Sequence, residues 1–418
     1  MEKNKSKLQS TLKMTPNGLK SSHQWSFKVY FRTGIYGWRG SQLAAKRLKE
    51  ALREINKVNK QESLLAAEGA IFLMSRLWPA LEHIDTSSGS LGNAVGNIIE
   101  KLLPILINAP ASLLVRQYWL DILWEILQAD GVGYVADIAQ YWGELAGYPE
   151  EASSRADVFA SLVKVAWQRD ESIVHYDVAY LSALYFAERF DEVLDAIKKD
   201  PRPSWQTREF GARVLVLTDP DKAIAYAENT RDIINTNQVS ISCFCEEALI
   251  KTCQINEAYI RYAIPANNAN TYLNWFNKIK KKYKTIKTDQ EILSDLIAAN
   301  IVEPGKWFAT ANKLKCFDLA LELIKANPAD PKTLNRAAKN RLDKEPNYSL
   351  NVAMSSLYWM TQGFGYEISN CDVHDALSVI KQSAKELGLW RVTKQQLEKM
   401  VETDTMAFIS KTISASLG

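Results

Sequence analysis

The middle of the chain carries four versions of one short phrase: ERFDEVL (188–194), TDPDKAI (218–224), CQINEAY (253–259) and KCFDLAL (315–321). Each version combines a turn, an acidic or amide residue, and a small residue followed by a larger apolar one, at the start of a predicted helix. The equivalent positions, which lie 30, 35 and 62 residues apart, are Val193, Ala223, Ala258 and Ala320. The last interval spans two periods of about 31 residues, and TDQEILSDL (288–296) supplies a degenerate copy within it.

This phrase resembles the turn and second-helix start of tetratricopeptide (TPR) helical hairpins, which repeat about every 34 residues. The small residue lets the second helix approach its partner closely, and the large residue fills the groove between hairpins. One hairpin cannot bury its apolar face alone, so the hairpins must stack. The resemblance implies an all-α fold, a right-handed α-solenoid of TPR-like helical hairpins with N- and C-terminal helical caps.

Apolar residues recur at helical spacing almost without a break after residue 41. The run from Leu64 to Trp78, for example, advances in steps of three and four residues, which marks one buried helix face. Proline and glycine separate these runs and predict about twenty helices with short connections. The only strand-like alternation, from Trp25 to Phe31, is too isolated to make a sheet by itself.

The composition is that of a folded soluble protein. The chain has 418 residues, of which 47% are apolar and 24% are charged, so disordered, collagen-like and membrane-spanning classes are excluded. We expect four parts: a basic, aromatic N-terminal arm (1–40, with 1–22 disordered), an N-terminal helical domain (41–150), TPR-like helical repeats (151–329) and a C-terminal helical cap (330–418).

Charge and cysteine content bear on partners and compartment. Residues 1–60 carry a net charge of +11, whereas the rest of the chain carries −8. Such a cationic segment favours a polyanion or an acidic protein surface, or it folds back onto the chain's own acidic part. The five cysteines are sparse and odd in number, and the first residues lack the apolar core of a secretory signal. We expect a cytoplasmic protein with no membrane partner.

The basic N-terminal segment has two interpretations. We expect an arm that packs onto the chain's own core and buries Tyr36 and Trp38. The alternative is a surface for nucleic acid or another anionic partner, since cations beside flat rings suit phosphates and unstacked bases. Its candidate residues are Arg32, Trp38, Arg39, Lys46, Lys49 and Arg53.

The helix predicted to begin at Ser41 has two sides. Its packed side is expected to hold Leu43, Leu48, Leu52, Ile55 and Asn59. Its outer side then presents cations at spacings of three and four residues, namely Lys46, Lys49, Arg53 and Lys57. A second basic run, NKIKKKYKTIK (277–287), is expected to be a solvated face at a helix C-terminus.

The segment IDTSSGSLGNAVGN (84–97) predicts a helix N-terminus, which can offer free N–H groups to an anion. We expect the helix to be capped by Asp85, Thr86 or Ser87. Gly92 and Gly96 would then allow a close helix crossing.

The same turn carries the weakest functional alternative, a hydrolase at residues 83–97. His83, Asp85 and Ser88 are the nucleophile and base candidates, but three neighbouring side chains without an oxyanion partner do not make a catalytic site.

Metal and cofactor motifs are missing from the sequence. It has no GxxxxGK[ST] loop, no GxGxxG and no HExxH spacing. The one conceivable zinc set is Cys243 and Cys245 with Cys371 and His374. Residues two apart on a helix diverge by about 200°, so we expect these cysteines to be ordinary apolar residues. We therefore expect no metal and no cofactor.

Three further phrases resemble those of an uncharacterised family of bacterial cytosolic helical-repeat proteins: RTGIYGWRGSQLA (32–44), RLWPALEHIDTSSGSLGNAVGN (76–97) and GKWFATANK (305–313). The resemblance implies a bacterial cytosolic protein and carries no activity or functional residue. Together with the repeats, it favours a non-catalytic scaffold that binds a protein partner in its solenoid groove. The alternative is a nucleic-acid-associated protein that uses the basic, aromatic N-terminal segment.

Overall fold

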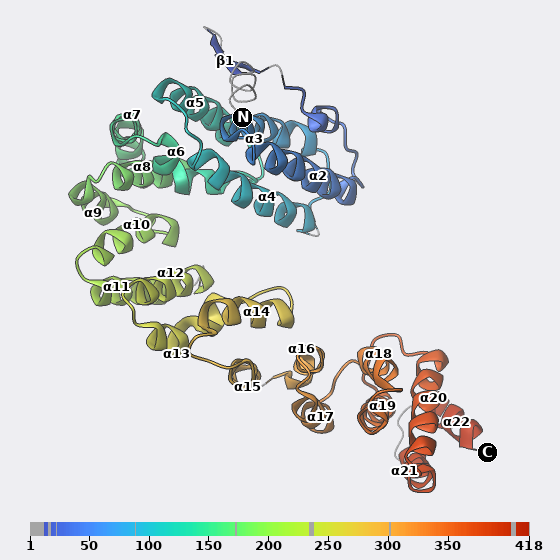
Figure 1. Cartoon of the computed structure of the whole chain (residues 1–418). Coiled ribbons are helices and arrows are strands. Elements are labelled where there is room, and N and C mark those ends of the chain that lie inside the picture. The colour runs from blue at the N-terminus through green and yellow to red at the C-terminus, as the bar shows by residue number, and fades with distance from the viewer. Residues whose placement is uncertain are drawn as a thin grey trace. The chain divides into compact units, whose positions relative to one another are not determined.

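The computed structural model describes residues 12–15, 18–21, 23–87, 89–171, 174–233, 238–300, 302–402 and 407–417. These residues form 21 α-helices, and helices that follow one another in sequence pack in consecutive pairs (Figure 1). The all-α, solenoid-like fold predicted from the repeated phrase is therefore confirmed. The chain divides into two compact units, Met1–Asn237 and Gln238–Gly418, and each is described by itself.

Unit 1 begins with a short hairpin and continues as helices. The hairpin pairs β1 (Leu12–Thr15) with β2 (Gly18–Ser21) in antiparallel register. The helices are η1 (Ser26–Tyr30), α2 (Ser41–Asn59), α3 (Ser63–Leu81), α4 (Ser90–Ile107), α5 (Leu113–Ala129), η2 (Ala136–Tyr141), α6 (Trp142–Ala146), α7 (Pro149–Gln168), α8 (Val174–Phe186), α9 (Phe190–Lys199), α10 (Trp205–Val216) and α11 (Pro220–Ile233).

Unit 2 is helical throughout its described residues. Its elements are α12 (Gln238–Lys251), α13 (Ile255–Ala266), α14 (Tyr272–Tyr283), α15 (Asp289–Ala299), η3 (Pro304–Trp307), α16 (Phe308–Lys313), α17 (Phe317–Ala326), α18 (Pro331–Arg341), α19 (Pro346–Thr361), α20 (Asn370–Glu386), α21 (Trp390–Glu402) and α22 (Ala407–Leu417). The division between the units falls inside the predicted repeat region, and the domain boundaries at residues 40, 150 and 329 remain predictions.

The repeated phrase marks the second helix of successive hairpins. Its four versions open α9, α11, α13 and α17, and the degenerate copy opens α15, where Thr288 and Glu291 form a capping box. The equivalent side chains are all fully buried: Val193, Ala223, Ala258 and Ala320. This burial confirms that the small residue of the phrase lies at a helix contact.

Three of the four hairpins share one backbone turn. Glu188, Cys253 and Lys315 occupy the same place in the phrase, and each has a positive φ near 60°. The next residue donates its N–H to the carbonyl five residues earlier, as from Arg189 to Leu184 at 3.0 Å. This pattern is the left-handed turn that ends many helices. The fourth version lacks it: Thr218 has no positive φ, and the Asp219 N–H donates instead to the Leu215 carbonyl, four residues earlier, at 2.8 Å.

The arm before α2 forms a 3₁₀ turn instead of a strand. Trp25, Phe27 and Phe31 are buried and Val29 is exposed, so the strand-like alternation of the sequence does not describe this segment. The Lys28 N–H donates to the Trp25 carbonyl three residues back at 3.2 Å, as in a 3₁₀ helix. The predicted disorder of residues 1–22 stays a prediction, because residues 1–11, 16, 17 and 22 lie outside the described residues.

Two helices of unit 1, α3 and α4, are long and apolar enough to cross a membrane by length and composition. Their apolar stretches are 61% and 44% buried within the protein. The same burial is found in core helices of a folded domain, so the two helices are weak evidence for a membrane span.

Candidate functional site

Helix α2 presents one apolar side and one cationic side. Ala44, Leu48 and Ile55 are buried against the neighbouring helices α3 and α4. The predicted outer cations are exposed, as are two cations of the preceding loop. We use the name basic face for these exposed residues, namely Trp38 with Arg32, Arg39, Lys46, Lys49, Arg53 and Lys57.

The acidic residues of α2 are already engaged elsewhere. The Glu50 carboxylate pairs with the Arg47 guanidinium at 2.6 Å, and the Glu54 carboxylate accepts hydrogen bonds from the Ser26 N–H and hydroxyl. Arg47 also lies 3.7 Å above the ring of Tyr30. Within the described part of the chain, the six cations of the basic face therefore have no acidic partner.

Trp38 corrects the packed-arm prediction. Its side chain is 67% exposed, whereas Tyr36, the other aromatic residue expected inside, is 5% exposed. The backbone around Trp38 is fixed, because its carbonyl accepts a hydrogen bond from the Asp85 N–H at 2.9 Å. The neighbouring turn is closed by the Gly40 N–H, which donates to the Gly37 carbonyl at 2.8 Å. The indole is thus displayed on an ordered loop.

Leu43 corrects the predicted packed side of α2. It is 51% exposed, while Leu48, Leu52 and Ile55 are buried as expected and Asn59 is half-buried. The reason is helical geometry: five residues separate Leu43 from Leu48, a rotation of about 140°. Leu43 therefore belongs to a different face of the helix.

Three of the six lysines in the second basic run have carboxylate partners within unit 2. Lys280 pairs with Asp289, and Lys287 lies near Glu291 at 3.5 Å. Lys282 reaches the fully buried carboxylate of Glu246, which also accepts hydrogen bonds from Tyr283 and Asn267. Since its partners lie 21 to 37 residues away, this cluster was not visible in the sequence. It joins α12, α13 and α14, and the prediction of a merely solvated face is incomplete.

The turn before α4 differs from its prediction. Gly89, with a φ of 65°, is the N-cap of α4, and it makes no side-chain cap. Asp85 instead accepts a hydrogen bond from the Ser87 N–H at 2.9 Å, and this bond lowers the pKa of the Asp85 carboxyl. No atom would lie within 4 Å of a Cβ at Gly92 or Gly96, so these glycines mark no close helix crossing. They line a shallow cleft of about 340 Å³.

The predicted nucleophile and base are not assembled by the described residues. His83 Nε2 lies 3.3 Å from the carboxylate of its neighbour Glu82, and Asp85 is bonded to Ser87. Ser88 lies outside the described residues. The hydrolase alternative therefore gains no support from this geometry.

The cysteine and histidine candidates for metal binding are separated. Cys243 Sγ lies 3.1 Å from the carbonyl of Ala266, and burial raises the pKa of its thiol. Cys371 and His374 are exposed on α20. Among the described residues, no group of three or more His, Cys, Asp or Glu side chains is arranged to hold a metal ion.

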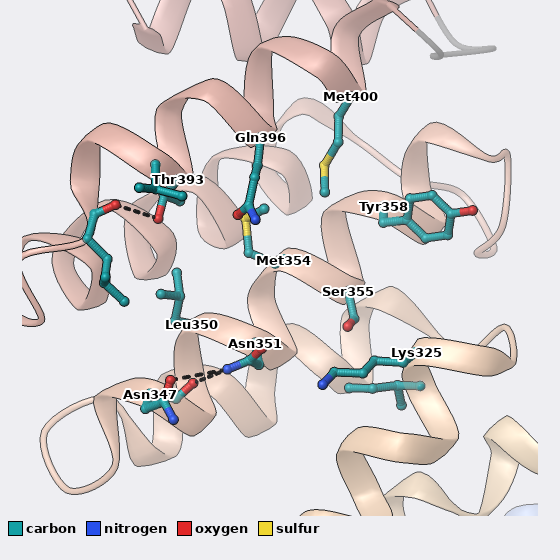
Figure 2. A pocket seen from close by; sticks show the side chains of 13 residues that line it. Lys325, Asn347, Leu350, Asn351, Met354, Ser355, Tyr358, Thr393, Gln396 and Met400 are labelled. Carbon is teal, nitrogen blue, oxygen red and sulfur yellow. Dashed lines mark hydrogen bonds between the residues drawn. The ribbon is translucent and has the colours of Figure 1, made fainter.

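A groove of about 520 Å³ lies between α17, α19 and α21 in unit 2. Figure 2 shows that Gln396 and Met400 extend from α21 toward α19, which contributes Asn351 and Met354. We call it the amide groove, and its lining consists of Ile324, Lys325, Asn347, Leu350, Asn351, Met354, Ser355, Tyr358, Leu389, Val392, Thr393, Gln396 and Met400. Lys325 is the only charged residue of this lining.

Two amides of the groove have bonding capacity left for a ligand. Asn351 donates its Nδ2 to the Asn347 carbonyl at 2.8 Å, which leaves its Oδ1 as an acceptor. Gln396 is exposed and brings both a donor and an acceptor. The Thr393 hydroxyl, by contrast, donates to the carbonyl of Leu389, the residue before α21, at 3.0 Å (Figure 2). Sequence reasoning missed this groove, because its three walls lie far apart along the chain.

Comparisons with known proteins give no match: no family model matches the chain, and no curated protein is significantly similar to it. The resemblance to an uncharacterised bacterial family therefore stays a prediction.

Proposed function

We propose that the chain is a non-catalytic helical-repeat scaffold that binds an extended segment of a protein partner in the amide groove. This proposal rests on the composition of the groove: its lining combines the side-chain amides of Asn351 and Gln396 with apolar side chains. A peptide backbone offers alternating N–H and C=O groups, and a side-chain amide can both donate to it and accept from it.

The apolar lining supports the same occupant. Met354 and Met400 flank the groove, and unbranched methionine side chains adapt to partners of different shape. Tyr358 and Val392 are partly exposed there and lose contact with water when a segment binds. Because Lys325 is the single charge, the groove favours a segment with little net charge.

A cytoplasmic location is part of this proposal. Cys243, Cys253, Cys316 and Cys371 are free thiols, and free thiols persist in a reducing compartment. The bacterial origin implied by the three resembling phrases is also retained as a proposal.

The test is selection of random peptides, displayed on phage, against the full chain. Peptides that occupy the groove should lose about 5- to 150-fold in affinity when Asn351→Leu and Gln396→Leu are combined. Each lost hydrogen bond costs about 0.5–1.5 kcal/mol, and about 1.4 kcal/mol corresponds to a factor of ten.

Gln382→Leu is the matched control, because Gln382 is also exposed, on α20, and lies outside the groove. The Gln382→Leu variant should bind the selected peptides with the same affinity as the unmodified chain. Peptides that bind the groove double variant with unchanged affinity would contradict the proposal.

A further inference from the structure

The basic face of unit 1 is a second surface with a definite chemistry. Lys46, Lys49, Arg53 and Lys57 follow one side of α2 at spacings of four and three residues. At a rise of about 1.5 Å per residue, they extend over about 16 Å. Along this line the side chains are exposed, and the two carboxylates of α2 are bound by other residues, Glu50 by Arg47 and Glu54 by Ser26.

An exposed aromatic ring precedes this line in the chain. Trp38 is three residues before the first residue of α2, and its neighbour Arg39 is exposed as well. The Trp38 ring is exposed to a ligand, while the Trp38 carbonyl is held by the Asp85 N–H. An exposed tryptophan on a fixed loop loses little conformational freedom when another flat ring stacks on it.

We propose that the basic face binds single-stranded nucleic acid, with phosphates along Lys46, Lys49, Arg53 and Lys57 and one base stacked on Trp38. Cations that track a backbone and an aromatic ring that accepts a base are the two elements of such recognition. A duplex keeps its bases stacked on one another and cannot use Trp38 in this way. The proposal is independent of the amide groove, which lies in the other unit.

A lipid surface is a poorer match for the same residues. A helix that lies in a membrane interface inserts its apolar side. Most of the apolar side of α2 is already buried against α3 and α4, and Leu43 is the one large apolar side chain that the helix exposes, so α2 has no continuous apolar stripe to insert. Binding to anionic vesicles is therefore an outcome that the experiment must distinguish.

The experiment measures the fluorescence anisotropy of a labelled short oligothymidylate or oligouridylate with the full chain. Four phosphate contacts predict that affinity falls about 50-fold between about 50 mM and 200 mM salt. Trp38→Ala should weaken binding about 5- to 150-fold without lowering the melting temperature appreciably, because the ring is largely exposed. Lys49→Glu combined with Arg53→Glu should remove binding at about 200 mM salt.

Two controls separate this site from general charge and from loss of folding. Lys381→Glu with Lys385→Glu reverses two exposed cations at the same spacing on α20, and Tyr366→Ala removes another exposed aromatic ring. Both control variants should bind like the unmodified chain. The proposal is overturned by equal losses in the controls, by unchanged binding of Trp38→Ala, or by tighter binding of a duplex. It also fails if phosphatidylserine vesicles retain the chain while neither oligonucleotide binds.

Discussion

The indole of Trp25 lies directly on the backbone of Gly69 in α3. A Cβ atom at position 69 would come within 2.2 Å of Trp25 Cζ2, closer than any real contact. Gly69 therefore provides the space in which the start of the arm packs on α3. Phe27 extends this contact, with its ring centroid 6.0 Å from that of Phe72. The arm is fixed at its start by an aromatic residue on a glycine, while Trp38 at its end faces solvent.

Gly69→Ala should destabilise the protein, because the rigid indole must move. Overpacking of this kind costs about 1–3 kcal/mol, which outweighs the gain of up to about 1 kcal/mol from better helix propensity. Thermal denaturation measures the difference. Gly92→Ala in α4 is the control: a Cβ there meets nothing within 4 Å, so only the propensity gain remains and the melting temperature should rise slightly.

The contrast between Trp25 and Trp38 explains what the sequence could predict about the arm. Interleaved aromatic residues indicate that some rings are buried, but not which ones. That choice depends on Gly69, 44 positions after Trp25, and on the hydrogen bond from Asp85 to the Trp38 carbonyl. The cationic side of α2 was predictable, since it follows from helical spacing alone.

The repeat alignment predicts that Ala223, Ala258 and Ala320 do not tolerate a larger side chain. All three are fully buried at the start of a second hairpin helix, so leucine should cost about 1–3 kcal/mol at each position. Ala298→Leu on the exposed side of α15 should be nearly neutral. If denaturation showed that all three buried variants are as stable as Ala298→Leu, the small residue would have no packing role.

The shared turn gives a stabilising prediction. Lys315 is exposed, with a φ of 63°, a conformation that costs a residue with a side chain about 1 kcal/mol relative to glycine. Lys315→Gly should therefore raise the melting temperature by a few degrees. Gly388 has a φ of 69° and open space around it, so a side chain there meets no atom but must adopt the left-handed conformation. Gly388→Ala should therefore lower the melting temperature. A stable Gly388→Ala variant would contradict this account of the turn.

The helices of the amide groove were more predictable than the groove itself. The spacing of apolar residues and the helix-breaking prolines and glycines predict α17, α19 and α21 as separate helices. The groove depends on which residues of α19 face those of α21, as Asn351 and Gln396 do, and that depends on how three helices pack. The Glu246 cluster was hidden for the same reason, since Lys282 lies 36 residues from it along the chain.

Glu68 predicts a pH dependence of stability in unit 1. Its carboxylate accepts a hydrogen bond from Trp119 Nε1 at 2.9 Å, but burial outweighs this bond and raises the pKa of the carboxyl. A folded-state pKa above the unfolded value means that the folded protein binds the proton more tightly. The contribution of Glu68 to the free energy of unfolding is then most favourable below the unfolded pKa of about 4.3. This contribution is lost as pH rises through the folded pKa.

Glu68→Gln should remove the loss of stability at higher pH, because the amide oxygen still accepts a hydrogen bond from Trp119 and carries no charge. The variant should match the unmodified protein near pH 4 and melt at a higher temperature near pH 7. Each unit of difference between the folded and unfolded pKa is worth about 1.4 kcal/mol, so the gap between the two melting curves measures the shift. If the glutamine variant were instead the less stable protein at pH 7, the ionised carboxylate would have to be stabilised by the Trp119 bond, and burial would not be the dominant effect.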